Sequence, residues 1–182
     1  MPRAMTRTDA GYGRSVNRFE ARNVSTAEVP VAIEEIWAVL RSPETLAELT
    51  PLLDSIAVSG DHWCWQMGGF SALGVEIAPS FTERMDFIEH ESIRFTHDPP
   101  AGSDERAGAD GLYTLETLEP GRTRLEIDIT LHVQLPLPRM SRGAVERIMS
   151  STMVRTGNVF ADRLYERLGV DPADASQSTV RA

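Results

Sequence analysis

The 182-residue chain suits a single domain, which would bury roughly 70% of its unfolded surface. Its formal net charge of −9 disfavours a general affinity for the phosphates of nucleic acids and for anionic membranes. No apolar run is long enough to span a membrane, no secretion signal is visible, and the single cysteine excludes an intrachain disulfide. We therefore expect a soluble, cytoplasmic protein that has no integral membrane segment and binds no nucleic acid.

Both ends of the chain lack the periodicity of helices and strands. Residues 1–18 are polar and contain glycine, and residues 171–182 have a similar character. Such segments bury too little apolar surface to compensate for the entropy lost on ordering. We expect a flexible N-terminal arm (1–18), one folded domain (19–170) and a flexible C-terminal tail (171–182).

The folded part begins with a strand and two short helices. Phe19–Val29 alternates weakly and predicts the first strand. The stretch VAIEEIWAVL that follows Pro30 carries apolar residues at helical spacing and predicts a helix. Ser42 before Pro43 is typical of a helix N-cap with proline at the first helical position, so SPETLAEL predicts a second helix that ends at Pro51.

After Pro51 the apolar period changes to two, which predicts antiparallel strands. The expected strands are Leu53–Val58, Trp63–Met67, Val75–Ile88, Ser92–His97, Leu112–Leu118 and Thr123–Gln134. In the last of these, Leu125, Ile127, Ile129, Leu131 and Val133 share one face, and Glu126, Asp128, Thr130 and His132 share the solvated one. The segment Asp98–Gly111 is expected to be a long flexible loop.

The last element is a long helix that begins near Ser141 and ends at Leu168, with Gly169 as its stop. Gly157 interrupts the helix and marks either a bend or the close approach of another backbone. Its expected inner stripe consists of Val145, Ile148, Met149, Thr152, Met153, Thr156, Val159, Phe160, Leu164 and Leu168.

The stretch PSFTERMDF (Pro79–Phe87) places a carboxylate on an apolar face. In a strand, Glu83 shares its face with Phe81, Met85 and Phe87. Burying an unpaired carboxylate in a solid core is costly. Either a bulge turns Glu83 outward, or the inside of the sheet contains a cavity; we expect Glu83 to point inward.

This order of elements resembles the START-like (SRPBCC, or helix-grip) superfamily, and within it the polyketide cyclase/dehydrase-like proteins. The local similarities are VPVAIEEIWAVLRSPETLAEL, GRTRLEIDITLHV and VFADRLYERL, and the resemblance covers Phe19–Leu168. It implies an α+β helix-grip fold, in which a curved antiparallel sheet of about seven strands wraps around the long C-terminal helix. The resemblance also implies a cavity between sheet and helix for lipids, sterols, quinones, plant metabolites or polyketide intermediates, and only some members catalyse a reaction.

Glu83 and His97 are the candidate catalytic residues. His97 follows Ile93 and Phe95 at period two, so adjacent strands can bring its imidazole close to the Glu83 carboxylate, as general acid–base catalysis requires. Alternatively, His97 closes its strand at a solvated end, and a bulge near Pro79 turns Glu83 out.

A larger set of residues is expected to line the cavity and bind a ligand. Methionines adapt to irregular ligands, although they fill ordinary cores equally well. Trp63 and Trp65 share one strand face and either flank a cavity or pack on the helix. The candidate ligand-binding residues are Trp63, Trp65, Phe81, Glu83, Met85, His97, Tyr113, Met149, Thr152, Met153, Thr156 and Phe160.

The sequence indicates neither a metal site nor a cofactor. The four histidines show no paired spacing, and no dinucleotide fingerprint, P-loop or nucleophile elbow is present. The first hypothesis for function is the binding of a small, mostly apolar metabolite or lipid. The second is a polyketide cyclase, aromatase or dehydratase-like enzyme, and the third is an interaction module that uses the arm or the Asp98–Gly111 loop. The sequence leaves open whether the protein is a monomer or a dimer.

Overall fold

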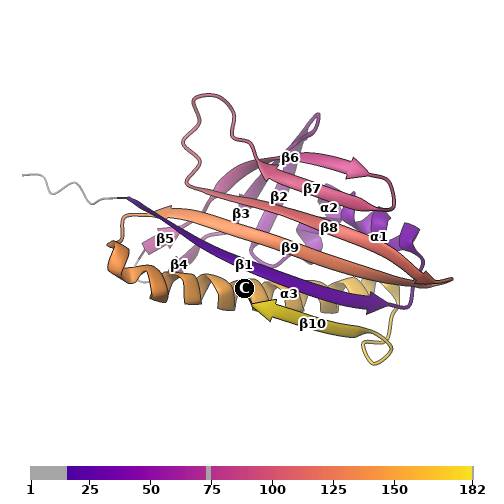
Figure 1. Cartoon of the computed structure of the whole chain (residues 1–182). Coiled ribbons are helices and arrows are strands. Elements are labelled where there is room, and N and C mark those ends of the chain that lie inside the picture. Colours follow the sequence, from indigo (N-terminus) through magenta and orange to yellow (C-terminus); the bar gives the residue numbers. More distant parts are fainter. Residues whose placement is uncertain (1–15, 73–74, 182) are drawn as a thin grey trace, which may run out of the picture.

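The computed structural model describes residues 16–72 and 75–181 and has the expected α+β helix-grip architecture (Figure 1). The helices are α1 (Ile33–Leu40), α2 (Pro43–Leu49), the 3₁₀ turn η1 (Arg139–Ser141) and α3 (Arg142–Leu168). The strands are β1 (Asn17–Val29), β2 (Leu53–Ser59), β3 (His62–Met67), β4 (Phe70–Ala72), β5 (Val75–Ile77), β6 (Ser80–Ile88), β7 (Ser92–His97), β8 (Ala107–Glu119), β9 (Arg122–Leu135) and β10 (Ser176–Arg181).

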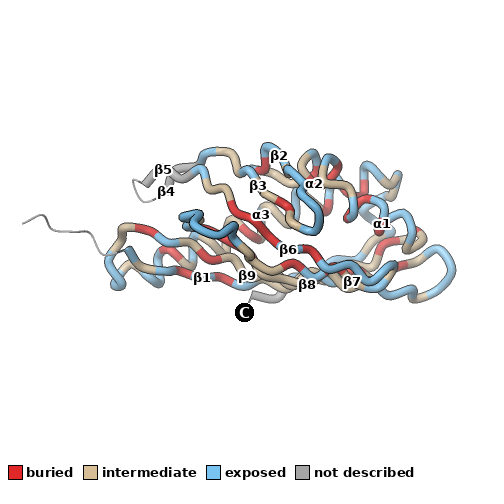
Figure 2. Tube along the Cα trace, turned by 90° about the horizontal axis from the view of Figure 1, so that it is seen from above, coloured by how far each residue is buried: buried red, intermediate tan, exposed pale blue. Residues whose placement is uncertain are grey.

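Eight of the described strands form one antiparallel sheet in the order β10-β1-β9-β8-β7-β6-β3-β2. The remaining two, β4 and β5, pair with each other. The long helix α3 runs along one face of the sheet, and α1 and α2 lie at one end of it (Figure 1). Buried and exposed positions alternate at the start of β1, as expected for a sheet that is covered on one side (Figure 2).

The signals for the short helices are confirmed. The Ser42 hydroxyl accepts a hydrogen bond from the Thr45 amide at 3.2 Å, and Pro43 occupies the first position of α2. The buried Trp37 of α1 packs edge-on against Phe87 of β6, with 6.3 Å between ring centroids. The two short helices thereby close one end of the sheet over a packed apolar core.

Three expectations about strands were wrong. The expected strand Val75–Ile88 is divided into β5 and β6 around Pro79, whose nitrogen cannot donate a ladder hydrogen bond. The expected loop Asp98–Gly111 is shorter, because β8 already begins at Ala107. The expected flexible C-terminal tail instead contains β10. This strand pairs antiparallel with β1, and Asn23 lies opposite Arg181. Most of the expected N-terminal arm lies outside the described residues, and its last two residues, Asn17 and Arg18, belong to β1.

The long helix ends where the sequence predicted. Gly169 has a φ of 68°, and its amide bonds to the carbonyl of Glu166, which closes the C-terminus of α3. Most of the expected inner stripe is at least half-buried, but Ile148 and Val159 are 36% and 37% exposed and lie at its margin. A methyl group at Gly157 would meet no atom within 4 Å, so this glycine does not mark the close approach of another backbone.

The buried apolar residues form two separate clusters. The larger one joins the short helices to the sheet and to the end of α3 that includes Leu164, and the smaller one consists of Phe19, Leu135 and Val145. The partly buried Val133 packs against both clusters and connects them.

Candidate functional site

A cavity of about 310 Å³ lies between the sheet and α3. It reaches both core clusters, because Phe81 and Leu164 of the larger and Leu135 and Val145 of the smaller contribute to its wall. The inner face of β9 supplies Leu125, Ile127, Ile129, Leu131 and Val133. Its wall is mainly apolar, as in most pockets for small molecules.

Nine of the twelve candidate ligand-binding residues line this cavity. They are Trp65, Phe81, Glu83, Tyr113, Met149, Thr152, Met153, Thr156 and Phe160. The other three, Trp63, Met85 and His97, do not line it. Trp63 and Met85 are 4% and 5% exposed and pack within the larger core cluster.

Glu83 points inward, as expected from the phase of its strand. It is 2% exposed, lines the cavity, and its Oε2 atom has no hydrogen-bond partner. Burial, reinforced by the nearby Asp110 carboxylate, raises the pKa of Glu83 well above its ordinary value, and the Trp65 indole opposes part of this rise. Burial therefore favours the uncharged acid of Glu83 over the carboxylate, relative to a glutamate in water.

Two more polar side chains of the cavity wall belong to the surroundings of Glu83. Trp65 stacks on Phe81 with 6.5 Å between ring centroids, and its buried Nε1 atom has no hydrogen-bond partner. Tyr113 packs on Phe95 at 5.1 Å, and burial together with the Glu83 carboxyl raises the pKa of its hydroxyl. The wall around Glu83 thus combines large aromatic surfaces with protonated polar groups.

His97 lies directly opposite Glu83 in the ladder between β6 and β7, but its ring bonds elsewhere. The Nε2 atom of His97 lies 3.0 Å from Oε2 of Glu105. The same carboxylate accepts hydrogen bonds from the amide and the hydroxyl of Thr82, each at 2.8 Å. The expected pairing of Glu83 with His97 was therefore wrong: the segment between β7 and β8 supplies a different carboxylate.

His132 was expected on the solvated face of β9, and this expectation was also wrong. It is 5% exposed, its ring lies 4.9 Å from that of His97, and it lines the cavity. The partner position on β8 is Gly108, where a methyl group would lie only 2.4 Å from the His97 ring and 2.7 Å from the His132 ring. Only glycine leaves room for both imidazoles, and burial lowers the pKa of His132.

Other lining residues were not among the site candidates. They include the inner face of β9 and, from β1, Asn23, Ser25 and Ala27. The clear alternation of β9 was the signal that could have identified its five residues. The weak alternation of β1 offered no comparable signal.

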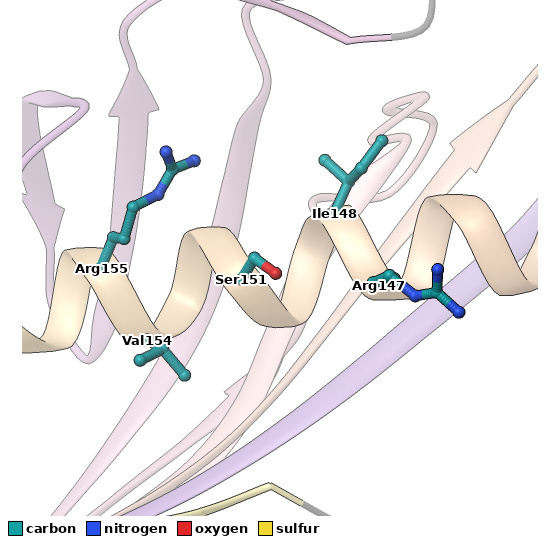
Figure 3. Close-up of a pocket in the computed structure, with 5 residues that line it drawn as sticks. All are labelled: Arg147, Ile148, Ser151, Val154 and Arg155. Carbon is teal, nitrogen blue, oxygen red and sulfur yellow. The ribbon is translucent and has the colours of Figure 1, made fainter.

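A second, shallow depression lies on α3 (Figure 3). Its lining residues, Arg147, Ile148, Ser151, Val154 and Arg155, all belong to that helix. Ile148 and Arg155 point to one side of the helix and Val154 points to the other, so the side chains do not converge on a common centre (Figure 3). We do not consider this depression a candidate site.

Within residues 16–72 and 75–181, no group of three or more histidine, cysteine, aspartate or glutamate side chains is placed to hold a metal ion. In the same part of the chain, no helix is both long and apolar enough to cross a membrane.

Solved structures share this fold, although no protein-family model and no curated protein matches the sequence. A conserved protein from Geobacillus kaustophilus superposes with a TM-score of 0.59 at 13% identity, over 86% of this chain and 98% of its own. A START superfamily protein from Mycobacterium smegmatis superposes with a TM-score of 0.58 at 16% identity, over 80% of this chain and 98% of its own. The Zhui aromatase/cyclase from Streptomyces sp. R1128 superposes with a TM-score of 0.55 at 15% identity, over 85% of this chain and 96% of its own.

These similarities confirm the START-like, helix-grip fold that the order of elements predicted. At such low identities they concern the fold alone and not the ligand or the reaction.

Proposed function

We propose that this protein binds a small, mostly apolar metabolite or lipid in the cavity between its sheet and α3. The observation that carries the proposal is the mainly apolar wall interrupted by Glu83, a buried carboxyl with an unpartnered oxygen. A buried polar group without a partner is costly, and ligand pockets are the usual place where proteins keep such groups. The fold shared with a START superfamily protein supports this function.

The volume limits the size of the ligand. At about 310 Å³, the cavity is at the small end of the range of roughly 300–1,000 Å³ that is usual for small-molecule sites. A compact molecule of two or three rings, or a short acyl chain, suits this space better than a whole two-chain lipid.

Native mass spectrometry of freshly purified protein tests this proposal. We expect a retained small molecule on the wild-type protein and its loss from Thr156→Trp, which fills the cavity from α3. Asn158→Trp is the matched control, because Asn158 is exposed on the same helix. A wild-type protein that retains no molecule and does not bind the apolar fluorophore 1-aminoanthracene would contradict the proposal.

An enzymatic role for the same cavity is the second candidate, namely a cyclase, aromatase or dehydratase-like reaction. It is favoured by the raised pKa of Glu83, because a carboxyl that keeps its proton can act as a general acid. His97 does not line the cavity, so of the two candidate catalytic residues only Glu83 would contact the substrate. Turnover of the retained compound, reduced about a hundredfold or more in Glu83→Gln, would establish this role. A binding protein would instead show altered affinity and no turnover.

A further inference from the structure

Trp65 and Tyr113, two polar side chains that share the cavity wall with Glu83, can both donate hydrogen bonds. The indole nitrogen of Trp65 is a donor only. The hydroxyl of Tyr113 keeps its proton, and a protonated Glu83 carboxyl also presents an O–H group. We call Glu83, Trp65 and Tyr113 the donor cluster.

The donor cluster is incomplete within the protein itself. By hydrogen-bond geometry, Oε2 of Glu83 and Nε1 of Trp65 are buried and unpartnered, although the Trp65 indole lies close enough to Glu83 to lower the pKa of its carboxyl. All three side chains line the cavity, and the covered atoms of Glu83 and Trp65 become available to a ligand when the side chains over them shift. A buried donor that finds no acceptor costs about 1–3 kcal/mol, which gives a ligand with a suitable acceptor a large advantage.

The charges around Glu83 argue against an ionised carboxylate that waits for a cation. The charged side chain that acts on Glu83 is Asp110, which has the same sign and favours protonation of Glu83. An ammonium group would need the ionised form of Glu83, which burial disfavours, whereas an uncharged oxygen can accept a hydrogen bond from the protonated form. The arrangement suits an uncharged oxygen better than an ammonium group.

We propose that the ligand carries a carbonyl or hydroxyl oxygen that accepts hydrogen bonds from the donor cluster, while the rest of the molecule contacts apolar walls. This inference rests on the proposed binding function and specifies its ligand class. The other unpartnered polar atoms of the cavity wall, on Asn23, His132 and Tyr165, come from β1, β9 and α3. They do not belong to the donor cluster, and between them the wall is formed by side chains such as Ile127 and Phe160.

A matched pair of probes tests the inference: 9-fluorenone, which has a ring carbonyl, and fluorene, which has a methylene group in the same place. Their affinities are measured by isothermal titration calorimetry for the wild type, Glu83→Leu and Trp65→Phe. The ratio of the two affinities, compared between variants, cancels the different hydrophobicities of the probes. We expect each variant to reduce the relative preference for fluorenone about fivefold to tenfold, the usual effect of one lost hydrogen bond.

Two further variants serve as controls. Glu83→Gln keeps a donor in its amide group, so it should retain most of the preference for fluorenone. Trp63→Phe changes a buried tryptophan that lies on β3 with Trp65 but does not line the cavity. It should therefore leave the preference for fluorenone over fluorene unchanged. Circular dichroism confirms that each variant is folded.

The possible results separate this inference from the proposed function. If both probes bind and their affinity ratio is the same in all variants, the donor cluster does not select the ligand, but the cavity still binds apolar molecules. If neither probe binds the wild type, the binding function fails and this inference fails with it. If 9-aminofluorene, a cation at neutral pH, binds more tightly than fluorenone and loses this advantage in Glu83→Gln, the ligand class is an amine and the inference is wrong.

Discussion

Glu83, which is buried, and Glu105, which is partly exposed, are two carboxyl groups near the first half of β6 with opposite surroundings. Glu105 accepts hydrogen bonds from the amide and hydroxyl of Thr82 and pairs with the ring of His97. Glu83, the next residue after Thr82, faces the cavity with an oxygen that has no partner. The two carboxyl groups therefore differ in their hydrogen-bond partners, and the more deeply buried one has fewer.

The alternation of side chains along β6 explains this difference. Thr82 and Glu83 point to opposite faces of the strand, so Thr82 is available to the loop segment that carries Glu105. Thr82 reaches Glu105 from its face of β6, and His97, which lies opposite Glu83 in the ladder, also directs its ring to Glu105, so neither residue provides Glu83 with a partner. We interpret Glu105 as a residue that fastens the loop and Glu83 as a residue that contacts the ligand.

The strongest test of this comparison is Glu105→Ala. It removes the acceptor of three hydrogen bonds and leaves the Thr82 amide, the Thr82 hydroxyl and the His97 ring without that partner. We expect the free energy of unfolding to fall by about 3 kcal/mol. Urea denaturation measures this loss, with the exposed Glu126→Ala as control. A loss no larger than that of the control would show that Glu105 does not fasten the loop.

His97→Ala should have a smaller effect on stability and none on binding. It removes one partner of Glu105 and leaves a gap beside His132, so we expect a loss of about 2 kcal/mol in urea denaturation. Because His97 does not line the cavity, the affinity for 9-fluorenone should stay within about twofold of the wild type. A selective loss of affinity in a stable His97→Ala protein would restore His97 to the ligand site.

Glu83→Gln should change the pH dependence of stability. The pKa of Glu83 is raised in the folded state, so the folded protein retains a proton that the unfolded chain releases above pH 4.5. The stability of the wild type therefore falls as pH rises from about 4.5 towards the pKa of folded Glu83. Glutamine does not titrate, so the variant should gain stability relative to the wild type as pH rises through this range. Urea denaturation at pH 4 and pH 8 measures the difference, and an unchanged difference at the two pH values would contradict the raised pKa.

The smallest effect is expected for Thr82→Val. This change keeps the shape of the side chain and the amide bond to Glu105 but removes the hydroxyl bond. We expect the free energy of unfolding to fall by about 1 kcal/mol, as measured by urea denaturation. Combining Thr82→Val with Glu105→Ala should cost less than the sum of the two, because both remove the same hydrogen bond. Additive losses would mean that the two residues act independently.

The sequence predicted the inward direction of Glu83 because strand phase is a local property. The apolar neighbours Phe81 and Met85 fix the parity of β6, and Glu83 shares it. The helices were predictable for the same reason, since Ser42, Pro43 and Gly169 mark their ends through local backbone chemistry.

The partner of His97 was not predictable because Glu105 lies in a segment without periodicity. Its position depends on the path of the chain between β7 and β8, which no local pattern fixes. The polar strand β10 was missed for a related reason: it is an edge strand, and its sequence SQSTVR has no apolar face to reveal it. The division at Pro79 could have been predicted, because proline is unfavourable inside a strand.

The pairing of β1 has a consequence for the order in which the protein folds during synthesis. Both neighbours of β1 in the sheet come from late in the chain: Val29 lies opposite Thr123 of β9, and Asn23 lies opposite Arg181 of β10. At about 5–20 residues per second, the ribosome needs on the order of ten seconds to produce the segment that separates β1 from β9. During this time the first strand has no partner from its own chain, although β2, β3 and β6 to β8 can already pair with one another. The first strand to be synthesised is thus among the last to join the sheet, and a chaperone that protects nascent strands would act on β1 in this interval.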